Sequence, residues 1–167
     1  HSYIEQAKNK GYKVLLLDSP IISHLIQKLE GSKENISFAR VDGDTIENLI
    51  KKEKASVSKL TDDEKETLKP IIEEVVKEGG YTVQLEPLDS SSLPFVLTQP
   101  EFMRRMKEMQ QTGGGGMMGA MPDMYNLVVN TNHELVGQIL NTKTQKKKER
   151  LIQQALDLAK LSQNLLK

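Results

Sequence analysis

The last stretch of the sequence places the strongest constraint on the fold. Residues 146–166 contain no Gly or Pro, which predicts one long helix. A helix that packs only on its own domain needs an apolar stripe about 100° wide, and here the apolar arc exceeds half of the circumference. That arc consists of Leu151, Ile152, Ala155, Leu156, Leu158, Ala159, Leu161, Leu165 and Leu166. We therefore expect a second buried face, against a partner chain or a helix outside this sequence; burial within its own domain is the alternative.

The preceding segment has the pattern of a small sheet flanked by helices. Thr61 and the acidic residues after it predict a helix start. Pro70 is expected to interrupt and kink this helix, which resumes and ends near Gly79. Apolar patterns predict strands at 81–85, 95–98 and 125–129, with helices at about 101–111 and around 135–139. The expected fold class is therefore α+β, with a three-stranded sheet, flanking helices and a long C-terminal helix.

The first part of the chain has a different pattern. Helices are predicted at 2–10, 21–29 and 44–50, separated by strands at 14–17 and 36–41. This order predicts a small αβα layered unit with a parallel sheet. Because residues 51–58 are polar and have little to bury, we place a boundary there, which gives domains 1–58 and 59–167.

Composition excludes several classes of protein. The 23 basic and 23 acidic residues balance, so no overall field attracts nucleic acid or an anionic membrane. There is no Cys and there are only three scattered His, which argues against disulfides, thiol chemistry and a His-rich metal site. The basic run at 143–150 lacks interleaved aromatic residues and is interpreted as a solvated helix start. The beginning at His1 resembles neither an initiator nor a signal peptide, so we expect a piece of a longer, cytoplasmic protein.

Methionine is distributed very unevenly. All 7 methionines lie between Met103 and Met124. Phe102, Met106 and Met109 share one helical face, and Met103 lies beside them. A core face is one interpretation, but the run of glycines at 113–116 and the methionines beyond it favour an adaptable surface for apolar protein segments. The glycines do not fit a phosphate loop, because no strand precedes them and no Lys-Ser or Lys-Thr pair follows.

No set of residues in the sequence forms a catalytic pattern. The acidic residues at 62–64 and 73–74 are expected on exposed helix surface, and His133 has a capping context without an acid–base partner. Two rival interpretations remain. One is a Met-rich signal-peptide-binding module of a ribonucleoprotein targeting particle. The other is an α/β enzyme with a ligand near Asp18 or Asp42.

Three segments of the second half resemble a known family. Residues 94–98 (Pro-Phe-Val-Leu-Thr), 103–107 (Met-Arg-Arg-Met-Lys) and 125–133 (Tyr-Asn-Leu-Val-Val-Asn-Thr-Asn-His) are similar to the C-terminal domain of bacterial ninety-kilodalton heat-shock chaperones. Residues 10–18, with Ile21 and Ile22, resemble the closing αβα part of that family's middle domain, and Leu68-Lys69-Pro70 also has a counterpart. The resemblance covers essentially the whole chain.

This resemblance implies the function of the intact protein and the role of this region in it. The family comprises ATP-driven homodimeric chaperones whose clients are unfolded or partly folded proteins. ATP and Mg²⁺ bind to an N-terminal domain outside this chain, so no catalytic residue, cofactor or metal is expected here, and one further helix is expected beyond Lys167. The resemblance implies client contacts at Phe102, Met103, Met106 and Met109. From the methionine pattern itself, we expect Met117 and Met118 in the loop to extend this client-binding surface. The resemblance also implies a dimer interface at Leu151, Ile152, Ala155, Leu158, Ala159, Leu161 and Leu165.

Overall fold

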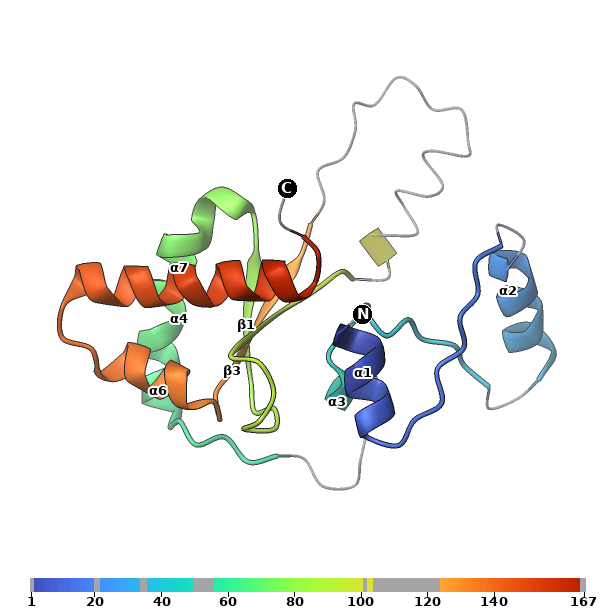
Figure 1. Cartoon of the computed structure of the whole chain (residues 1–167), viewed down its shortest axis with the longest axis horizontal. Coiled ribbons are helices and arrows are strands. Elements are labelled where there is room, and N and C mark those ends of the chain that lie inside the picture. The colour runs from blue at the N-terminus through green and yellow to red at the C-terminus, as the bar shows by residue number, and fades with distance from the viewer. Residues whose placement is uncertain are drawn as a thin grey trace, which may run out of the picture.

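The computed structural model describes residues 2–19, 22–33, 36–49, 56–100, 102–103 and 124–165. Most of the regular structure lies in the second half of the chain, where helices cover a small sheet (Figure 1). The elements are α1 (Ser2–Asn9), α2 (Ile22–Ser32), α3 (Ile46–Leu49), α4 (Asp62–Val76), the 3-10 turn η1 (Lys77–Gly79), β1 (Thr82–Glu86), β2 (Phe95–Thr98), β3 (Asn126–Asn130), α6 (Glu134–Asn141) and α7 (Gln145–Ser162).

The three strands form one mixed sheet in the order β1-β3-β2. The central strand β3 pairs in parallel with β1, with Val83 opposite Leu127. It pairs antiparallel with β2, with Val96 opposite Val128. Helices and a mixed sheet together confirm the predicted α+β class and its three-stranded sheet.

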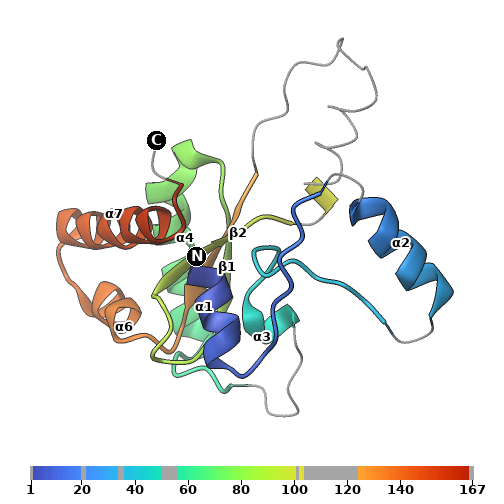
Figure 2. The same cartoon turned by 45° about the vertical axis from the view of Figure 1, so that its right-hand side comes forward.

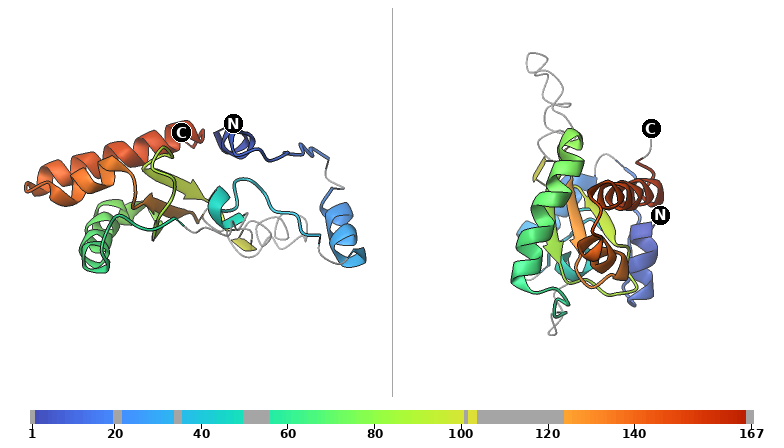
Figure 3. Two further views of the ribbon diagram at one scale, coloured as in Figure 1. Left: turned by 90° about the horizontal axis from the view of Figure 1, so that it is seen from below. Right: turned by 90° about the vertical axis from the view of Figure 1, so that its left-hand side faces the viewer.

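Alternation along the strands gives the sheet two apolar faces. On one face, Phe95, Leu97, Leu127 and Val129 form the main core with residues of α4, α6 and α7. Figure 3 shows these helices on the same side of the sheet. On the other face, Val96 and Val128 form a smaller cluster with Leu88, and Tyr3 of α1 packs against it. The sheet is therefore covered on both sides, by α4, α6 and α7 on one and by α1 on the other.

Helix α4 begins with a capping box. The Oγ1 atom of Thr61 accepts a hydrogen bond from the Glu64 N–H, and the Glu64 carboxylate accepts one from the Thr61 N–H at 2.8 Å. The helix then continues through Pro70 to Val76, so the predicted interruption does not occur. Pro70 is exposed, whereas Leu68 and Ile72 on either side of it are completely buried. Burial of both halves of the helix in one core offsets the backbone hydrogen bond that proline removes.

The turn after β3 holds the linker that precedes α4 against the sheet. The Nδ2 amide of Asn132 donates hydrogen bonds to the carbonyls of Val57 and Leu88, and its Oδ1 atom accepts one from the Lys59 N–H at 2.7 Å. Asn130 is also buried, and its side chain accepts a hydrogen bond from the Asn132 N–H. These buried amides fix the chain at its entry into α4.

The N-terminal part of the chain differs from the sequence prediction. Residues 14–17 and 36–41 were expected to form strands, but among the described residues they pair with no strand. Leu15 and Leu16 are 70% and 79% exposed. A β-strand needs a neighbour for its backbone groups, and no element of the described chain supplies one here. The two strands and the parallel sheet of the predicted αβα layer are therefore not formed among the described residues, whereas its three helices are present; α2 lies away from the sheet (Figure 2).

Candidate functional site

The predicted apolar surface begins directly after β2. Phe102 is 69% exposed, and Met103 beside it is partly buried. A large aromatic side chain left in water at this position is available to a partner. The other residues predicted to share this surface, Met106, Met109, Met117 and Met118, lie outside the described residues, as does most of the helix predicted at 101–111.

Helix α7 divides the predicted interface residues into two groups. Ile152, Ala155 and Ala159 are buried in the core of their own chain, and Leu151 and Leu165 pack against that core. Leu158 and Leu161 are instead 49% and 60% exposed. They lie one turn apart, near the end of the helix. Among the predicted interface residues, Leu158 and Leu161 are therefore the two that are exposed, and we call them the exposed leucine pair.

The end of α7 is fixed by a backbone motif that the sequence prediction missed. Asn164 has a φ of 56°, in the left-handed region, and the Leu165 N–H donates to the carbonyl of Lys160 at 2.8 Å. The Asn164 N–H donates to the carbonyl of Leu161. This is the pattern of a Schellman cap, in which Asn is tolerated at the left-handed position. The helix therefore ends at Ser162 and does not continue to residue 166 as expected.

Tyr3 and Gln163, which the sequence analysis did not single out, meet at the free edge of β2. The Gln163 Oε1 atom accepts a hydrogen bond from the Leu97 N–H, and its Nε2 group donates to the Leu97 carbonyl, both at 3.0 Å. The Tyr3 hydroxyl also donates to the Leu97 carbonyl, at 2.5 Å, and accepts a hydrogen bond from Gln163 Nε2. We call this arrangement of Tyr3, Leu97 and Gln163 the edge clasp. No local sequence pattern predicts the edge clasp, because its members are 66 to 160 positions apart.

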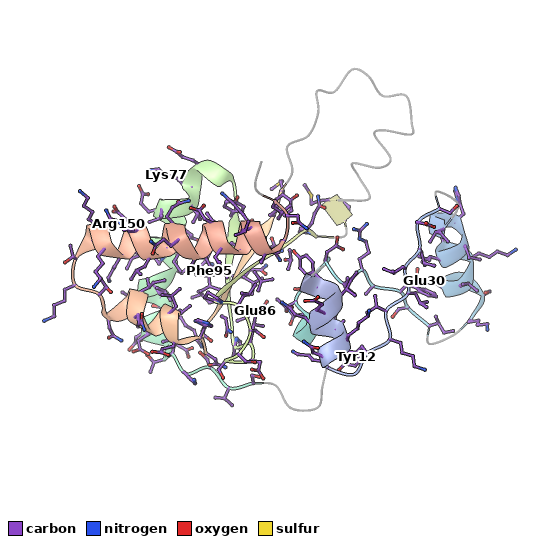
Figure 4. All side chains as sticks on the ribbon, viewed as in Figure 1. Tyr12, Glu30, Lys77, Glu86, Phe95 and Arg150 are labelled. Carbon is purple, nitrogen blue, oxygen red and sulfur yellow. The ribbon has the colours of Figure 1, made fainter. Side chains whose placement is uncertain are left out.

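A second polar contact holds α3 against the sheet. Glu86, at the end of β1, accepts hydrogen bonds from Asn48 Nδ2 at 3.0 Å and from Thr45 Oγ1 at 3.3 Å. Figure 4 shows Glu86 on the side of the sheet that faces the N-terminal helices. Nearby, the Gln99 N–H donates to the carbonyl of Asp42. Asp42 itself pairs with Arg40, so the aspartate proposed by the enzyme interpretation is engaged in a local ion pair.

Among the described residues, the ionisable groups discussed below take part in contacts that stabilise the fold. Burial, and secondarily the charge of Asp42, raise the pKa of the Tyr3 phenol well above its usual range. A hydrogen bond from Lys65 lowers the pKa of Asp62, and a hydrogen bond from Ser91 lowers that of Asp89. His133 serves as the N-cap of α6, where its Nδ1 atom accepts from the Leu135 N–H. These arrangements stabilise turns and helix ends and assemble no acid–base pair.

The described residues also include neither a group of side chains that could bind a metal ion nor a helix that could span a membrane. Among them, no three His, Asp or Glu side chains are grouped so that they could bind a metal ion. Within the same ranges, no helix has the length and apolar character needed to cross a membrane. At the start of α7, Lys146 and Lys147 are exposed, as a solvated basic run requires.

Comparison with known proteins identifies the family. Residues 1–162 match the family described as Hsp90 protein. The chain is 40% identical over 145 residues to chaperone protein HtpG of Porphyromonas gingivalis, a match that covers 84% of this chain and 21% of that protein. It is 40% identical over 144 residues to the HtpG of Bacteroides thetaiotaomicron, covering 84% of this chain and 21% of the relative. With HtpG of Bacteroides fragilis the identity is 39% over 143 residues, covering 83% and 21%. This chain spans about a fifth of the length of these relatives, and it belongs to the Hsp90 family of heat-shock chaperones.

Proposed function

We propose that this region of an Hsp90-family chaperone binds apolar segments of client proteins and contributes to contact between two subunits. The observation that carries the client role is the exposure of Phe102, 69% of whose surface is open to water, beside Met103. An aromatic ring and a flexible thioether together suit partners of varied shape. The family membership supplies the context, because the relatives are named as chaperones.

The proposed mechanism is reversible burial of apolar surface. Full burial of a Phe side chain is worth about 1.5–3 kcal/mol, at about 25 cal/mol per Å² removed from water. A client that covers the exposed part of Phe102 would thus gain on the order of 1 kcal/mol from this residue, or about a fivefold increase in affinity. Such a contribution is small enough to be released when the client folds. The proposal assigns binding and no catalysis to this region, and places hydrolysis of ATP, with Mg²⁺, outside its 167 residues.

Suppression of aggregation tests the client role. A model protein is heated with the wild-type chain, with Phe102→Ser or with Val57→Ser, and light scattering is followed. Val57 is a matched control, because it is 86% exposed but lies in the linker before α4. We expect Phe102→Ser to require several times more chaperone for the same suppression, whereas Val57→Ser behaves as wild type. Equal loss in both variants would show that suppression does not depend on this surface.

The exposed leucine pair on α7 supports the subunit role. Leu158 and Leu161 present apolar surface to water although Ile152, Ala155 and Ala159 on the same helix are fully used by their own core. A residual apolar stripe on an otherwise packed helix favours a contact with a second chain.

Sedimentation velocity across a concentration series tests this contact. The double variant Leu158→Ser/Leu161→Ser is expected to weaken self-association at least about tenfold. The two leucine side chains contribute apolar surface mainly to the proposed interface and little to the core. The free energy of unfolding should change by about 1 kcal/mol or less. An unchanged association constant would remove α7 from the subunit contact.

The family assignment also bears on the two rival functions. A ribonucleoprotein targeting module and an α/β enzyme would each need a different family, whereas residues 1–162 match the chaperones. The strand ends at which an enzyme's ligand was expected, near Asp18 and Asp42, are not formed among the described residues. The chaperone function is the one that sequence, fold and family support together.

A further inference from the structure

We propose that the edge clasp makes Gln163 a positioning residue, through which helix α1 controls the placement of the exposed leucine pair at the end of α7. Gln163 directly follows α7 and contacts both Leu97 of β2 and Tyr3 of α1. The clasp thus joins the beginning and the end of the described chain. The proposal rests on the subunit role of Leu158 and Leu161 for its functional consequence, but not for its structural one.

The first step is that the side chain of Gln163 bonds to the edge of β2 in the way that a neighbouring strand would. β2 lies at the edge of the sheet, with β3 on its other side. The side-chain amide of Gln163 pairs with both the N–H and the carbonyl of Leu97, as the backbone of a neighbouring strand would. Unpaired edge groups are a point of unwanted strand addition, and this amide covers them. The end of α7 is therefore attached to the sheet by two directional bonds in addition to its apolar packing.

The second step is that the position of Gln163 depends on α1. The Tyr3 hydroxyl donates to the same Leu97 carbonyl and accepts from Gln163 Nε2. Its ring packs on the cluster of Val96, Val128 and Leu88. Tyr3 keeps its donor at neutral pH, because the ordinary pKa of a phenol is 10.0 and burial raises it further. Displacement of α1 removes one bond from Gln163 and one from the Leu97 carbonyl.

The third step is that Gln163 is rigidly connected to the leucine pair. The Gln163 N–H donates to the carbonyl of Ala159, and the Schellman cap at Asn164 and Leu165 fixes the following turn. Leu158 and Leu161 lie within the two turns of α7 that precede this point. A change at Gln163 therefore alters the last turn of α7, which contains Leu161 and directly follows Leu158.

Amide hydrogen exchange in the full 167-residue chain tests the clasp. Tyr3→Phe keeps the ring and removes the hydroxyl, and it is expected to speed exchange of the Gln163 and Leu165 amides about fivefold, the effect of one typical net hydrogen bond. Tyr81→Phe is the matched control, because Tyr81 also packs partly buried against the core and its substitution removes the same atom. Unchanged exchange at Gln163 and Leu165 in Tyr3→Phe would overturn the proposal.

A double-mutant cycle distinguishes coupling from general loosening. Gln163→Met is expected to speed exchange of the Leu97 amide and of the last turn of α7, and adding Tyr3→Phe should then change the last turn no further. Gln154→Met controls for the substitution itself, because Gln154 is exposed on the same helix. If Gln163→Met does not fold, Gln163→Asn shortens the same amide and replaces it in the cycle. Additive effects of the two substitutions would contradict coupling through Gln163.

Self-association of the same variants separates this proposal from the proposed function. If Leu158 and Leu161 form the subunit contact, Tyr3→Phe should weaken association about fivefold, in parallel with the faster exchange. Unchanged association in Leu158→Ser/Leu161→Ser would reject the subunit role, while the exchange result would still decide the clasp. Altered exchange in Tyr3→Phe with unaltered association would leave the clasp in place and reject its control of the leucine pair.

Discussion

Single polar side chains carry much of the specificity of this fold. Asn132 bonds to three backbone groups from two other segments, and Gln163 bonds to both backbone groups of Leu97. Such groups are expensive to leave unpaired in a protein interior, so each side chain fixes one arrangement of the chain around it. Both amides act far from their own positions in the sequence, and they connect segments that apolar packing alone would leave free to slide.

Asn132 gives the clearest prediction for a single residue. Asn132→Ala would leave the Lys59 N–H and the carbonyls of Val57 and Leu88 without their partner. We expect a loss of about 2–4 kcal/mol in the free energy of unfolding, measured by urea denaturation. Asn141→Ala serves as control, because Asn141 is exposed and makes one local bond to Gly137; its effect should stay within about 0.5 kcal/mol. Equal effects would mean that the Asn132 bonds contribute little.

The raised pKa of Tyr3 predicts a loss of folding stability at alkaline pH. Its pKa in the folded chain is raised above the ordinary value of 10.0. Above about pH 10 the unfolded state therefore releases a proton that the folded state keeps, and stability falls as pH rises, by up to about 1.4 kcal/mol per pH unit. Tyr3→Phe should remove this part of the slope when urea unfolding is compared at pH 9 and above. Identical slopes for wild type and variant would show that Tyr3 ionises equally in both states.

At the level of elements, local sequence signals predicted most helices and all strands of the main sheet. The strand prediction at 95–98 agrees with β2, and those at 81–85 and 125–129 match β1 and β3 within one residue. The alternation of Val83 and Leu85, and the apolar runs of β2 and β3, required burial that this sheet provides. These elements were predictable because short-range pattern and long-range packing agree.

Other predictions were wrong or incomplete where the local sequence pattern and the packing disagree. The leucines at 15–17 form an apolar run typical of a buried strand, yet no described strand lies beside them, so they remain exposed. Pro70 lies on an exposed side of α4 whose opposite side is buried, and the helix continues through it. The exposed Leu158 and Leu161 could not be separated from the buried Ile152 and Ala155 by periodicity, because all belong to one broad arc. The edge clasp depends on contacts between distant segments, which a single sequence does not reveal.

Helix α4 provides the prediction at this level. Thr61→Ala removes the hydroxyl of the capping box and leaves the Glu64 N–H without its acceptor. The expected cost is about 1 kcal/mol, seen as a lower urea midpoint with an unchanged denaturant slope. Thr61→Ser keeps the oxygen and should retain nearly the full stability. A loss in Thr61→Ser as large as in Thr61→Ala would point to the lost methyl group instead of the cap.

At the scale of the whole molecule, stability and contact reside in different residues. The core of α4, α6, α7 and the sheet is closed by side chains such as Phe95, which lies beneath α7 (Figure 4). The proposed contacts use exposed side chains at its border: Phe102 after β2, and Leu158 and Leu161 on α7. Substitution of the exposed group should therefore change binding without unfolding the chain, and substitution of the core should do the reverse.

Direct binding of an unfolded client tests the proposed function most sharply. A fluorescently labelled, permanently unfolded polypeptide is titrated with the wild-type chain, Phe102→Ser and Val57→Ser, and anisotropy gives each Kd, with urea unfolding measured on the same samples. We predict a Kd about fivefold higher for Phe102→Ser, wild-type affinity for Val57→Ser, and a free energy of unfolding within about 0.5 kcal/mol of wild type for both. An unchanged Kd in Phe102→Ser, or a loss of affinity that only follows a loss of stability, would contradict a client surface at this position.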